Sequence, residues 1–181
     1  MGTIQRQWKV LIVLAVATAC GGSDGGGPTT PDGPDIRGTY TGSPPAGHTF
    51  SIQFLPDDPA SFSCPGAVVV SSSSGGSFGG TFRIDPCALA GIQQPVPLSI
   101  LSGTVQEDGS IRFQVEAQDA IIQGLQEEGC DELEVDEAFT GTVSGGSFAA
   151  AIEGRFDCPD PEVEGERVTV VVRWSFEGTS S

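Results

Sequence analysis

Apolar and polar residues alternate along most of the chain beyond about residue 36, and this period of two predicts β-strands. In the stretch ERVTVVVRWSF, one face of the predicted strand carries Val168, Val170, Val172, Trp174 and Phe176. The stretch IRFQV alternates in the same way, with an apolar face of Ile111, Phe113 and Val115. Strands with one apolar face are typical of antiparallel sheets, whereas strands of parallel sheets read as continuous apolar runs.

Glycine-rich turns set the register between neighbouring strands. The segment SGGSF occurs at Ser74–Phe78 and at Ser144–Phe148, and each copy predicts a two-residue hairpin on Gly-Gly. The second hairpin then opposes small or apolar residues, in the pairs Val143–Phe148, Gly141–Ala150 and Phe139–Ile152. In the segment QEDGS, a three-residue loop with a left-handed Gly109 opposes apolar residues, in the pairs Val105–Ile111 and Leu101–Val115.

The first SGGSF hairpin also predicts the disulfides. Its register pairs Val69 with Phe82 and Ala67 with Ile84, and its extension to the strand ends places Cys64 opposite Cys87. Directly opposed residues have Cβ atoms about 4.5–5.5 Å apart, which a modest adjustment brings within disulfide range. Of the three connectivities that four cysteines allow, this register selects Cys64–Cys87 and Cys130–Cys158.

Two further strands, Gly38–Gly42 and His48–Leu55, bring the total to eight or nine. The sequence therefore predicts an all-β domain over residues 37–178, an antiparallel up-and-down meander that closes as a barrel or a barrel-like sandwich. The segment Gln118–Glu128 predicts one short helix, with Asp119 as its N-cap and Gly129 as its stop.

The segment GTY at Gly38–Tyr40, together with Arg173-Trp174 on the last predicted strand, resembles calycin-like barrels such as the lipocalins. Tyr40 stands where that family carries a tryptophan. The resemblance implies a barrel and implies nothing about a ligand. A generic β-domain whose strands begin with Gly-Thr would carry the same residues.

The N-terminus departs from the strand pattern. After Arg6 and Lys9, residues Val10–Ala19 form an uncharged, mostly apolar run of ten, whereas a membrane-spanning helix needs about 20. A positive start, a short apolar core and small residues before a break are typical of an export signal. Ala17-Thr18-Ala19 followed by Cys20 resembles a bacterial lipobox, which implies cleavage before Cys20 and acylation of that cysteine. The alternative is an ordinary A-x-A cleavage site and secretion.

The number of cysteines favours the lipobox. The chain has five, and an odd thiol in an exported protein requires an explanation. Acylation of Cys20 leaves four cysteines for two disulfides in an oxidising compartment. Gly21 stands where Asp would signal retention at the inner membrane, so the resemblance implies an outer-membrane lipoprotein. The predicted organisation is a signal peptide over 1–19, then the lipidated cysteine and a flexible Gly/Pro/Asp tether over 20–36.

Charge excludes one class of partner. Loss of residues 1–19 removes Arg6 and Lys9, which leaves six arginines, no lysine, 24 acidic residues and a net charge of −18. A nucleic-acid-binding protein needs a basic surface, and this composition does not supply one. The same charge disfavours adsorption to anionic headgroups, so we expect the acyl chains on Cys20 to make the membrane attachment.

Candidate catalytic groups are few. GGSFG at Gly75–Gly79 matches the G-x-S-x-G pattern of a hydrolase, but that pattern requires a strand–turn–helix context and a later histidine. Ser77 instead follows a predicted hairpin tip, and the sole histidine, His48, precedes it. We therefore predict a protein that is not an enzyme and has no organic cofactor. His48 shares parity with Phe50 and points inward, so His48 and Trp174 are candidate ligand-binding residues; the alternative for His48 is a hydrogen-bonded core residue.

Acidic residues form two groups, over 127–137 and over 157–166. The predicted Cys130–Cys158 bridge brings both groups to one end of the barrel, where mutual repulsion would favour a hard cation with oxygen ligands. The candidate Ca²⁺ ligands are Asp131, Glu134, Asp136, Asp157, Asp160 and Glu162. Neither group has the spacing of an EF-hand loop, and the alternative is a solvated acidic rim.

Two functions follow from these observations. The first is a monomeric, membrane-anchored binding module that takes a small apolar ligand in the barrel or a protein partner at the acidic rim. The second is a structural envelope protein without a small ligand. Core packing discriminates between a barrel that binds a small ligand inside and a barrel that does not, because a barrel filled by its own side chains leaves no pocket.

Overall fold

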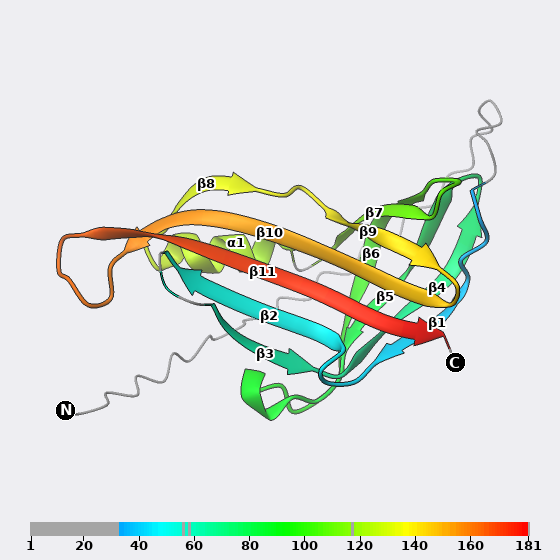
Figure 1. Ribbon diagram of the computed structural model, residues 1–181, viewed down its shortest axis with the longest axis horizontal. Helices are drawn as coiled ribbons and strands as arrows, with labels where there is room; N and C mark the ends of the chain where they lie inside the picture. The colour runs from blue at the N-terminus through cyan, green and yellow to red at the C-terminus, as the bar shows by residue number, and fades with distance from the viewer. Residues whose placement is uncertain (1–32, 56, 58, 117, 181) are drawn as a thin grey trace.

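The alternating strands close into an antiparallel barrel in the computed structural model, which describes residues 33–180 except 56, 58 and 117 (Figure 1). Around the barrel the strands follow the order β11, β1, β4, β5, β6, β7, β9, β10, and β10 pairs with β11 to close it. Their bounds are β1 (Gly38–Gly42), β4 (Gly66–Ser74), β5 (Ser77–Ile84), β6 (Val96–Val105), β7 (Ser110–Val115), β9 (Phe139–Ser144), β10 (Ser147–Pro159) and β11 (Arg167–Ser180). The predicted all-β barrel is confirmed.

Two excursions interrupt the meander. Between β1 and β4 the chain forms β2 (Gly47–Phe54) and β3 (Ala60–Cys64), and β2 adds to the edge of β11. Between β7 and β9 it forms α1 (Gln118–Glu127) and β8 (Asp131–Val135), and β8 adds to β10. A short 3₁₀ turn, η1 (Ala88–Ala90), lies between β5 and β6. The long strands β10 and β11 therefore run beyond the barrel (Figure 1).

The part beyond the barrel is called here the distal lobe: α1, β8 and the β10–β11 hairpin from Gly154 to Val172. It has its own small core, in which Phe156 and Val170 pack with the Cys130–Cys158 disulfide. Helix α1 covers this core with Ile122 and Leu125. The observed bounds match the predicted helix to within one residue, and Gly129, with φ of 84°, follows its end as predicted. Asp119 lies inside the first turn, so the predicted N-cap role is wrong.

Aromatic rings fill the barrel. Phe82 is fully buried at the centre, with ring centroids 4.7–5.6 Å from those of His48, Phe113, Phe139, Trp174 and Phe176. Full burial of one such side chain is worth about 1.5–3 kcal/mol, and edge-to-face contacts add to this. The alternating faces predicted for β7 and β11 supply many of these rings, together with Phe148 from β10.

The hairpin registers agree with the sequence except where a bulge intervenes. The β9–β10 pairs Val143–Phe148 and Gly141–Ala150 are confirmed. In β4–β5 the predicted register holds beside the turn, but a bulge between Val70 and Ser72 shifts the rest by one residue. Phe82 therefore faces Val68, and Ala67 faces Arg83, so the predicted pairs with Val69 and Ile84 are wrong.

A second bulge has the same effect on β6–β7. The three-residue loop is confirmed, with Val105 opposite Ile111 and a φ of 84° at Gly109. The register then shifts between Ile100 and Ser102, so Ile100 faces Val115 and Leu101 points outward, 64% exposed. The predicted Leu101–Val115 pair is wrong because the bulge turns Leu101 out of the ladder.

Both predicted disulfides are confirmed, although Cys64 lies in β3 opposite His48 and does not face Cys87 across the β4–β5 ladder as predicted. Cys64–Cys87 has a Cα–Cα distance of 5.4 Å and Cys130–Cys158 one of 4.1 Å. Cys64 ends β3, one residue before Pro65, and Cys87 follows β5, where it forms an isolated bridge with Ile92. The first disulfide therefore joins the edge of the β2–β3 excursion to the η1 loop, and the second joins α1 and β8 to the β10–β11 hairpin.

Replacing Cys130 and Cys158 together by serine is expected to lower the free energy of unfolding by about 3–4 kcal/mol, because the bridge closes a loop with a sequence separation of 28. Denaturant unfolding measures this loss. Hydrogen exchange should show the lost protection in α1 and β8, while β4 and β5 keep theirs. A uniform loss across the barrel strands would contradict the assignment of this bridge to the distal lobe, and the Cys64→Ser/Cys87→Ser variant is the matched control.

Candidate functional site

His48 lies in the barrel core, where it is completely buried. It belongs to β2, and its ring packs edge-on against Phe82 with centroids 4.7 Å apart and at a tilt against Phe176 with centroids 4.8 Å apart. Gly66 makes room for it, since a Cβ at that position would lie 2.3 Å from the imidazole. The inward direction predicted from the parity of β2 is therefore observed.

Both nitrogens of His48 have partners. Nε2 lies 2.8 Å from the carbonyl oxygen of Arg83, and the indole Nε1–H of Trp174 donates to Nδ1 at 3.2 Å. A carbonyl only accepts and an indole N–H only donates, so the neutral tautomer with hydrogen on Nε2 satisfies both contacts. Burial lowers the pKa of His48 to about 4, which keeps the ring neutral at physiological pH.

This arrangement uses the polar atoms of both His48 and Trp174 within the fold. The ring N–H groups of both side chains already have partners within the fold, and the surrounding aromatic rings occupy the interior of the barrel. The alternative of a hydrogen-bonded core histidine therefore describes the observed geometry. Two pockets open on the outer surface instead.

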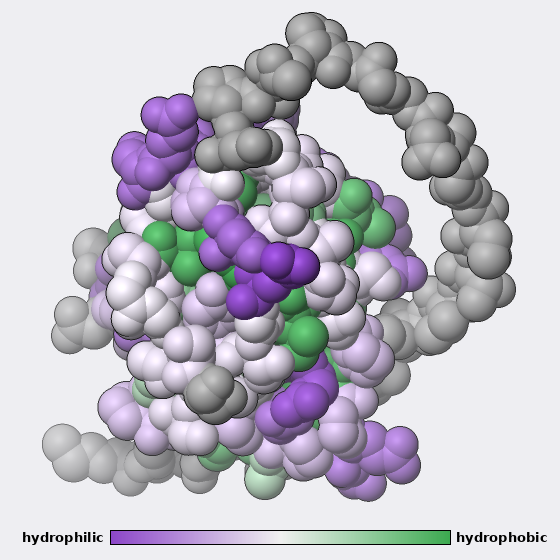
Figure 2. All heavy atoms as spheres, turned by 90° about the vertical axis from the view of Figure 1, so that its right-hand side faces the viewer, coloured by the Kyte–Doolittle hydropathy of each residue, from purple (hydrophilic) through white to green (hydrophobic). Residues whose placement is uncertain are grey.

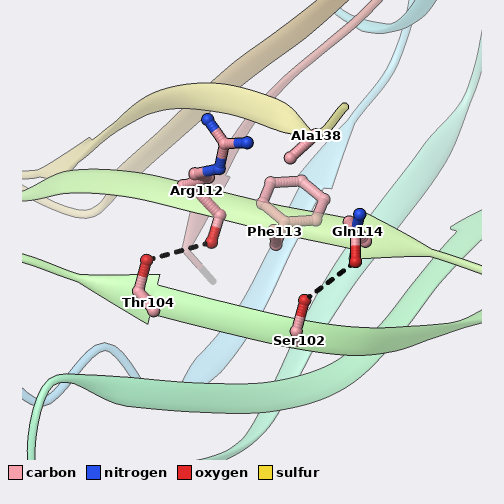
Figure 3. A pocket seen from close by; sticks show the side chains of 6 residues that line it. All are labelled: Ser102, Thr104, Arg112, Phe113, Gln114 and Ala138. Atoms are coloured by element: carbon pink, nitrogen blue, oxygen red, sulfur yellow. Dashed lines mark hydrogen bonds between the residues drawn. The ribbon is translucent and has the colours of Figure 1, made fainter. Parts of the chain in front are cut away.

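The first outer pocket lies on β6 and β7, beside the bulge at Leu101 (Figure 3). Its volume is about 260 Å³, and its lining is Ser102, Thr104, Arg112, Phe113, Gln114 and Ala138. The hydroxyl of Ser102 donates to Gln114 Oε1 at 3.3 Å, and Arg112 pairs with Glu137 at 3.1 Å. The polar groups of this pocket largely bind one another.

The second outer pocket is a groove of about 360 Å³ where β8 and β9 meet the side of β10. Its lining mixes charges of both signs: Glu134, Asp136, Thr140, Ala151, Ile152, Glu153, Arg155 and Arg173. In the strand registers Glu134 faces Arg155 and Glu153 faces Arg173. Within the described residues neither arginine has a carboxylate oxygen within 4 Å, whereas the other four arginines of the domain each form an ion pair.

The acidic segments meet in the distal lobe, as the Cys130–Cys158 bridge predicted. Several candidate Ca²⁺ ligands make other contacts there. Arg167 binds Asp131 at 2.7 Å and Asp157 at 2.6 Å. Asp160 Oδ1 accepts the backbone N–H groups of Glu162 and Val163.

Glu134 and Asp136 line the groove beside β10, and Asp136 Oδ2 accepts the backbone N–H of Glu153 at 3.0 Å. Across the described part of the chain, no three His, Cys, Asp or Glu side chains are grouped so as to hold a metal ion. The six residues therefore lie in three places: two bind Arg167, two lie in the turn after β10, and two line the groove. The Ca²⁺ site stays a prediction.

Ser77 begins β5, directly after the Gly75-Gly76 turn, with φ of 57° and 72° at the two glycines. The context is strand–turn–strand, as predicted, rather than the strand–turn–helix of a nucleophile elbow. His48 is enclosed in the core, where its nitrogens contact Arg83 and Trp174.

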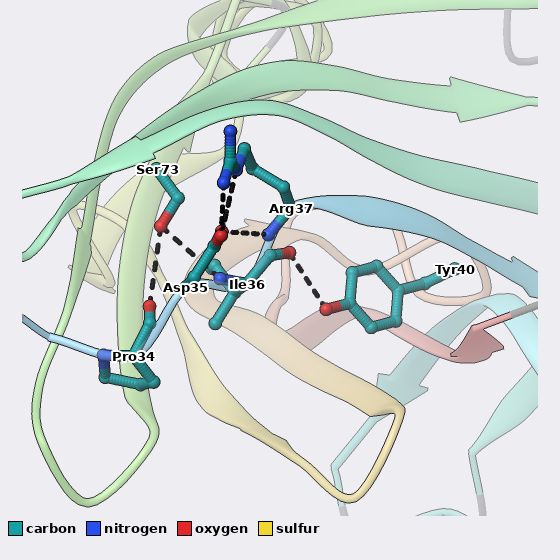
Figure 4. A network of polar contacts seen from close by, with 6 residues as sticks. All are labelled: Pro34, Asp35, Ile36, Arg37, Tyr40 and Ser73. Atoms are coloured by element: carbon teal, nitrogen blue, oxygen red, sulfur yellow. Dashed lines mark hydrogen bonds and ion pairs between the residues drawn. The ribbon is translucent and has the colours of Figure 1, made fainter.

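One contact network was missed by the sequence analysis, which placed residues 20–36 in a flexible tether. Ile36 is only 4% exposed and joins the barrel core. The hydroxyl of Tyr40 donates to the Ile36 carbonyl at 2.9 Å, and Ser73 Oγ contacts both the Ile36 N–H and the Pro34 carbonyl at 3.4 Å (Figure 4). Ile36 is the first large apolar residue after Cys20, and this was the available signal.

The charged neighbours of Ile36 stay at the surface. Arg37 binds the Asp35 carboxylate and, chiefly through this side-chain hydrogen bond, lowers the pKa of Asp35 to about 2. We call Pro34–Tyr40 together with Ser73 the N-terminal clamp. The clamp shortens the tether, since Gly33–Ile36 pack on the barrel.

The lipobox-like residues, Cys20 and the predicted signal peptide lie outside the described residues. Within the described part, no helix is long and apolar enough to span a membrane.

No family model and no curated protein matches this chain. Among solved structures it is similar to a multidomain protein including DUF1735 from Bacteroides ovatus, with a TM-score of 0.25 and 10% sequence identity. The match covers 79% of this chain and 57% of the other. At that TM-score the likeness supports no conclusion about fold or function.

Lowering the pH from 6.5 to 4 is expected to destabilise the protein through His48. Its pKa of about 4 in the folded state lies below the ordinary 6.5, so the unfolded chain binds the proton first and the free energy of unfolding falls across this window. The full loss is about 3 kcal/mol. Denaturant unfolding at several pH values measures it.

His48→Gln is the control variant, because a glutamine amide offers a donor for Arg83 and an acceptor for Trp174 but does not titrate. We expect the difference in unfolding free energy between wild type and H48Q to shrink as the pH falls through the window. A difference independent of pH would contradict the buried neutral imidazole.

Proposed function

We propose that this protein is an exported, outer-membrane lipoprotein, anchored by acyl chains on Cys20, whose non-catalytic barrel binds a protein partner through its outer surface. The observation that carries the proposal is the filling of the barrel by its own aromatic side chains. An internal ligand of the lipocalin type would need space that these rings occupy.

Both ends of the barrel support this choice. At one end Ile36 is buried in the core and is held there by Tyr40. Towards the other end, the completely buried Cys64 forms a disulfide with Cys87. The backbone of Cys87 in turn forms a β-bridge with Ile92. A small apolar ligand would therefore have to displace packed side chains before it reached the interior.

The disulfides support export and acylation. All four cysteines beyond Cys20 are bonded in pairs, which is typical of an oxidising compartment. Cys20 is the fifth cysteine of the sequence, and it stands directly after the lipobox-like residues Ala17-Thr18-Ala19. Acylation explains the odd count of cysteines.

The outer surface carries the charged side chains and the two pockets. Both pockets open there, and the mixed-charge groove beside β10 carries the two arginines that form no ion pair within the described residues. A surface with guanidinium groups next to carboxylates fits polar protein contacts better than an apolar small molecule.

Acylation is tested by growing bacteria that express the full-length chain with an alkyne-tagged palmitate. We expect labelled protein in the membrane fraction, and no label with release from the membrane for Cys20→Ser. Membrane attachment of the unlabelled C20S protein would contradict the anchor.

The absence of an internal ligand from the filled barrel is tested by native mass spectrometry of exported C20S protein. We expect a bare polypeptide whose mass lies four hydrogens below that of the reduced chain, since two disulfides remove two hydrogens each. A stoichiometric apolar adduct that is lost on unfolding would overturn the filled-barrel argument.

A further inference from the structure

The turns at one end of the barrel are joined into a single rim. Val105 N–H donates to the Gly76 carbonyl, Val143 N–H to the Gly109 carbonyl and Ser180 N–H to the Gly146 carbonyl, at 2.8, 2.8 and 2.6 Å. These bonds bring three hairpin turns and the last described residue of β11 together. We call this rim, with its turns Gly75-Gly76, Glu107–Gly109 and Gly145-Gly146, the hairpin end.

The tether leaves the domain at the hairpin end. Gly33 packs so closely there that an added Cβ would lie 2.6 Å from the Val105 carbonyl oxygen and 3.2 Å from Gly76 Cα. From this point the N-terminal clamp fixes the chain, because Ile36 enters the core and Tyr40 and Ser73 bind its backbone. The exit point is therefore set by packing rather than by the tether itself.

The distal lobe lies at the opposite end of the molecule (Figure 1). Strand β10 runs unbroken from Ser147, beside the hairpin end, to Pro159. At about 3.3 Å per residue this strand is about 40 Å long. The turn between β10 and β11 is thus about 40 Å from the hairpin end, and it carries Asp160, Glu162, Glu164 and Glu166.

The hairpin end is polar but carries little charge. Its turns consist largely of serine and glycine, with Glu107 and Asp108 in one of them. Figure 2, which faces this side of the molecule, is mostly pale, with strongly hydrophilic and hydrophobic residues scattered across it. Such a surface fits close approach to lipid headgroups without insertion, whereas the carboxylates of the distal lobe would be repelled by anionic lipids.

We propose that the hairpin end is the face that the domain turns to the lipid bilayer, so that the distal lobe is held away from the membrane. The inference rests on the acyl anchor at Cys20 and assigns a direction to it. Twelve residues separate Cys20 from Gly33, and a tether of that length, with the flexibility that its Gly-rich composition predicts, would span about 20 Å on average. This reach is shorter than β10, so the hairpin end stays the nearer end.

The orientation also determines which surfaces face a partner. The barrel end nearest the lipids is closed by Ile36, which blocks entry of an acyl chain from the bilayer. The distal lobe and the groove beside β10 lie on the parts of the molecule that are farther from the membrane.

Energy transfer to the bilayer tests the proposal with full-length acylated protein. The protein is placed in vesicles of phosphatidylethanolamine and phosphatidylglycerol that carry a lipid-linked acceptor. A dye-bearing non-natural residue replaces Glu107 at the hairpin end or Glu164 at the distal turn. Both glutamates are exposed and each replacement removes one negative charge, so the two proteins are matched.

We expect transfer from position 107 to exceed transfer from position 164 by at least about twofold, given about 40 Å between the two turns. Equal transfer, or greater transfer from position 164, in protein that carries the acyl label would overturn the orientation. Protein that carries no acyl label and does not bind the vesicles would instead contradict the proposed anchor, so the two failures are distinguishable.

A clamp variant tests the cause of the orientation. Ile36→Ser combined with Tyr40→Phe removes the buried side chain and the hydroxyl that hold Ile36, and is expected to lengthen the tether and reduce the difference between the two positions. Leu101→Ser, an exposed position outside the clamp, is the control and should leave the difference unchanged. A clamp variant that stays folded in a thermal melt and keeps the full difference would show that the clamp does not set the direction.

Discussion

The antiparallel ladder between β10 and β11 is the constraint on which the rest of the structure depends. Thirteen residue pairs join these strands, from Ser147–Thr179 beside the hairpin end to Pro159–Arg167 in the distal lobe. The first part closes the barrel and contributes Phe148, Trp174 and Phe176 to its core. The outer part continues as a sheet to which β8 and β2 add, one on each side. One hairpin therefore holds the barrel and the distal lobe in a fixed relation.

The two strands of this ladder were among the elements that the sequence predicted well, although their register with each other was not predicted. Strict alternation from Val168 to Phe176 assigns the buried face of β11, and the Gly145-Gly146 turn sets the β9–β10 register. The errors arose at two bulges, between Val70 and Ser72 and between Ile100 and Ser102. In the first case the run Ser71–Ser74 has no apolar alternation to mark the extra residue. A bulge is a local backbone choice that tertiary packing selects, so side-chain parity does not reveal it.

The candidate site was predictable to a similar depth. Parity placed His48 inside, and the Cys130–Cys158 pairing inferred from the hairpin register placed the acidic segments together. The partners of those groups were not predictable, because they come from strands distant in sequence: Trp174 lies 126 residues from His48, and Arg167 lies 36 residues from Asp131. The clamp was missed for the opposite reason. Residues 33–36 continue the Gly/Pro/Asp composition of the predicted tether, and this composition does not reveal that Ile36 is buried in the barrel core.

The arginines of the domain have two roles, one in the distal lobe and one in the proposed partner-binding groove. Four of the six arginines of the domain form ion pairs with carboxylates. Arg167 binds both Asp131 and Asp157 and so connects β8, β10 and β11 beside the Cys130–Cys158 disulfide. Such partly exposed pairs contribute little stability individually, and their value lies in fixing the geometry of the distal lobe. Arg155 and Arg173 instead face the groove, each opposite a glutamate across the strand ladder. Because the β10–β11 ladder fixes the strands that carry Arg155 and Arg173, a partner that contacts the proposed surface would meet charges that are already positioned. Specificity would then arise from the outer wall of the barrel rather than from its interior.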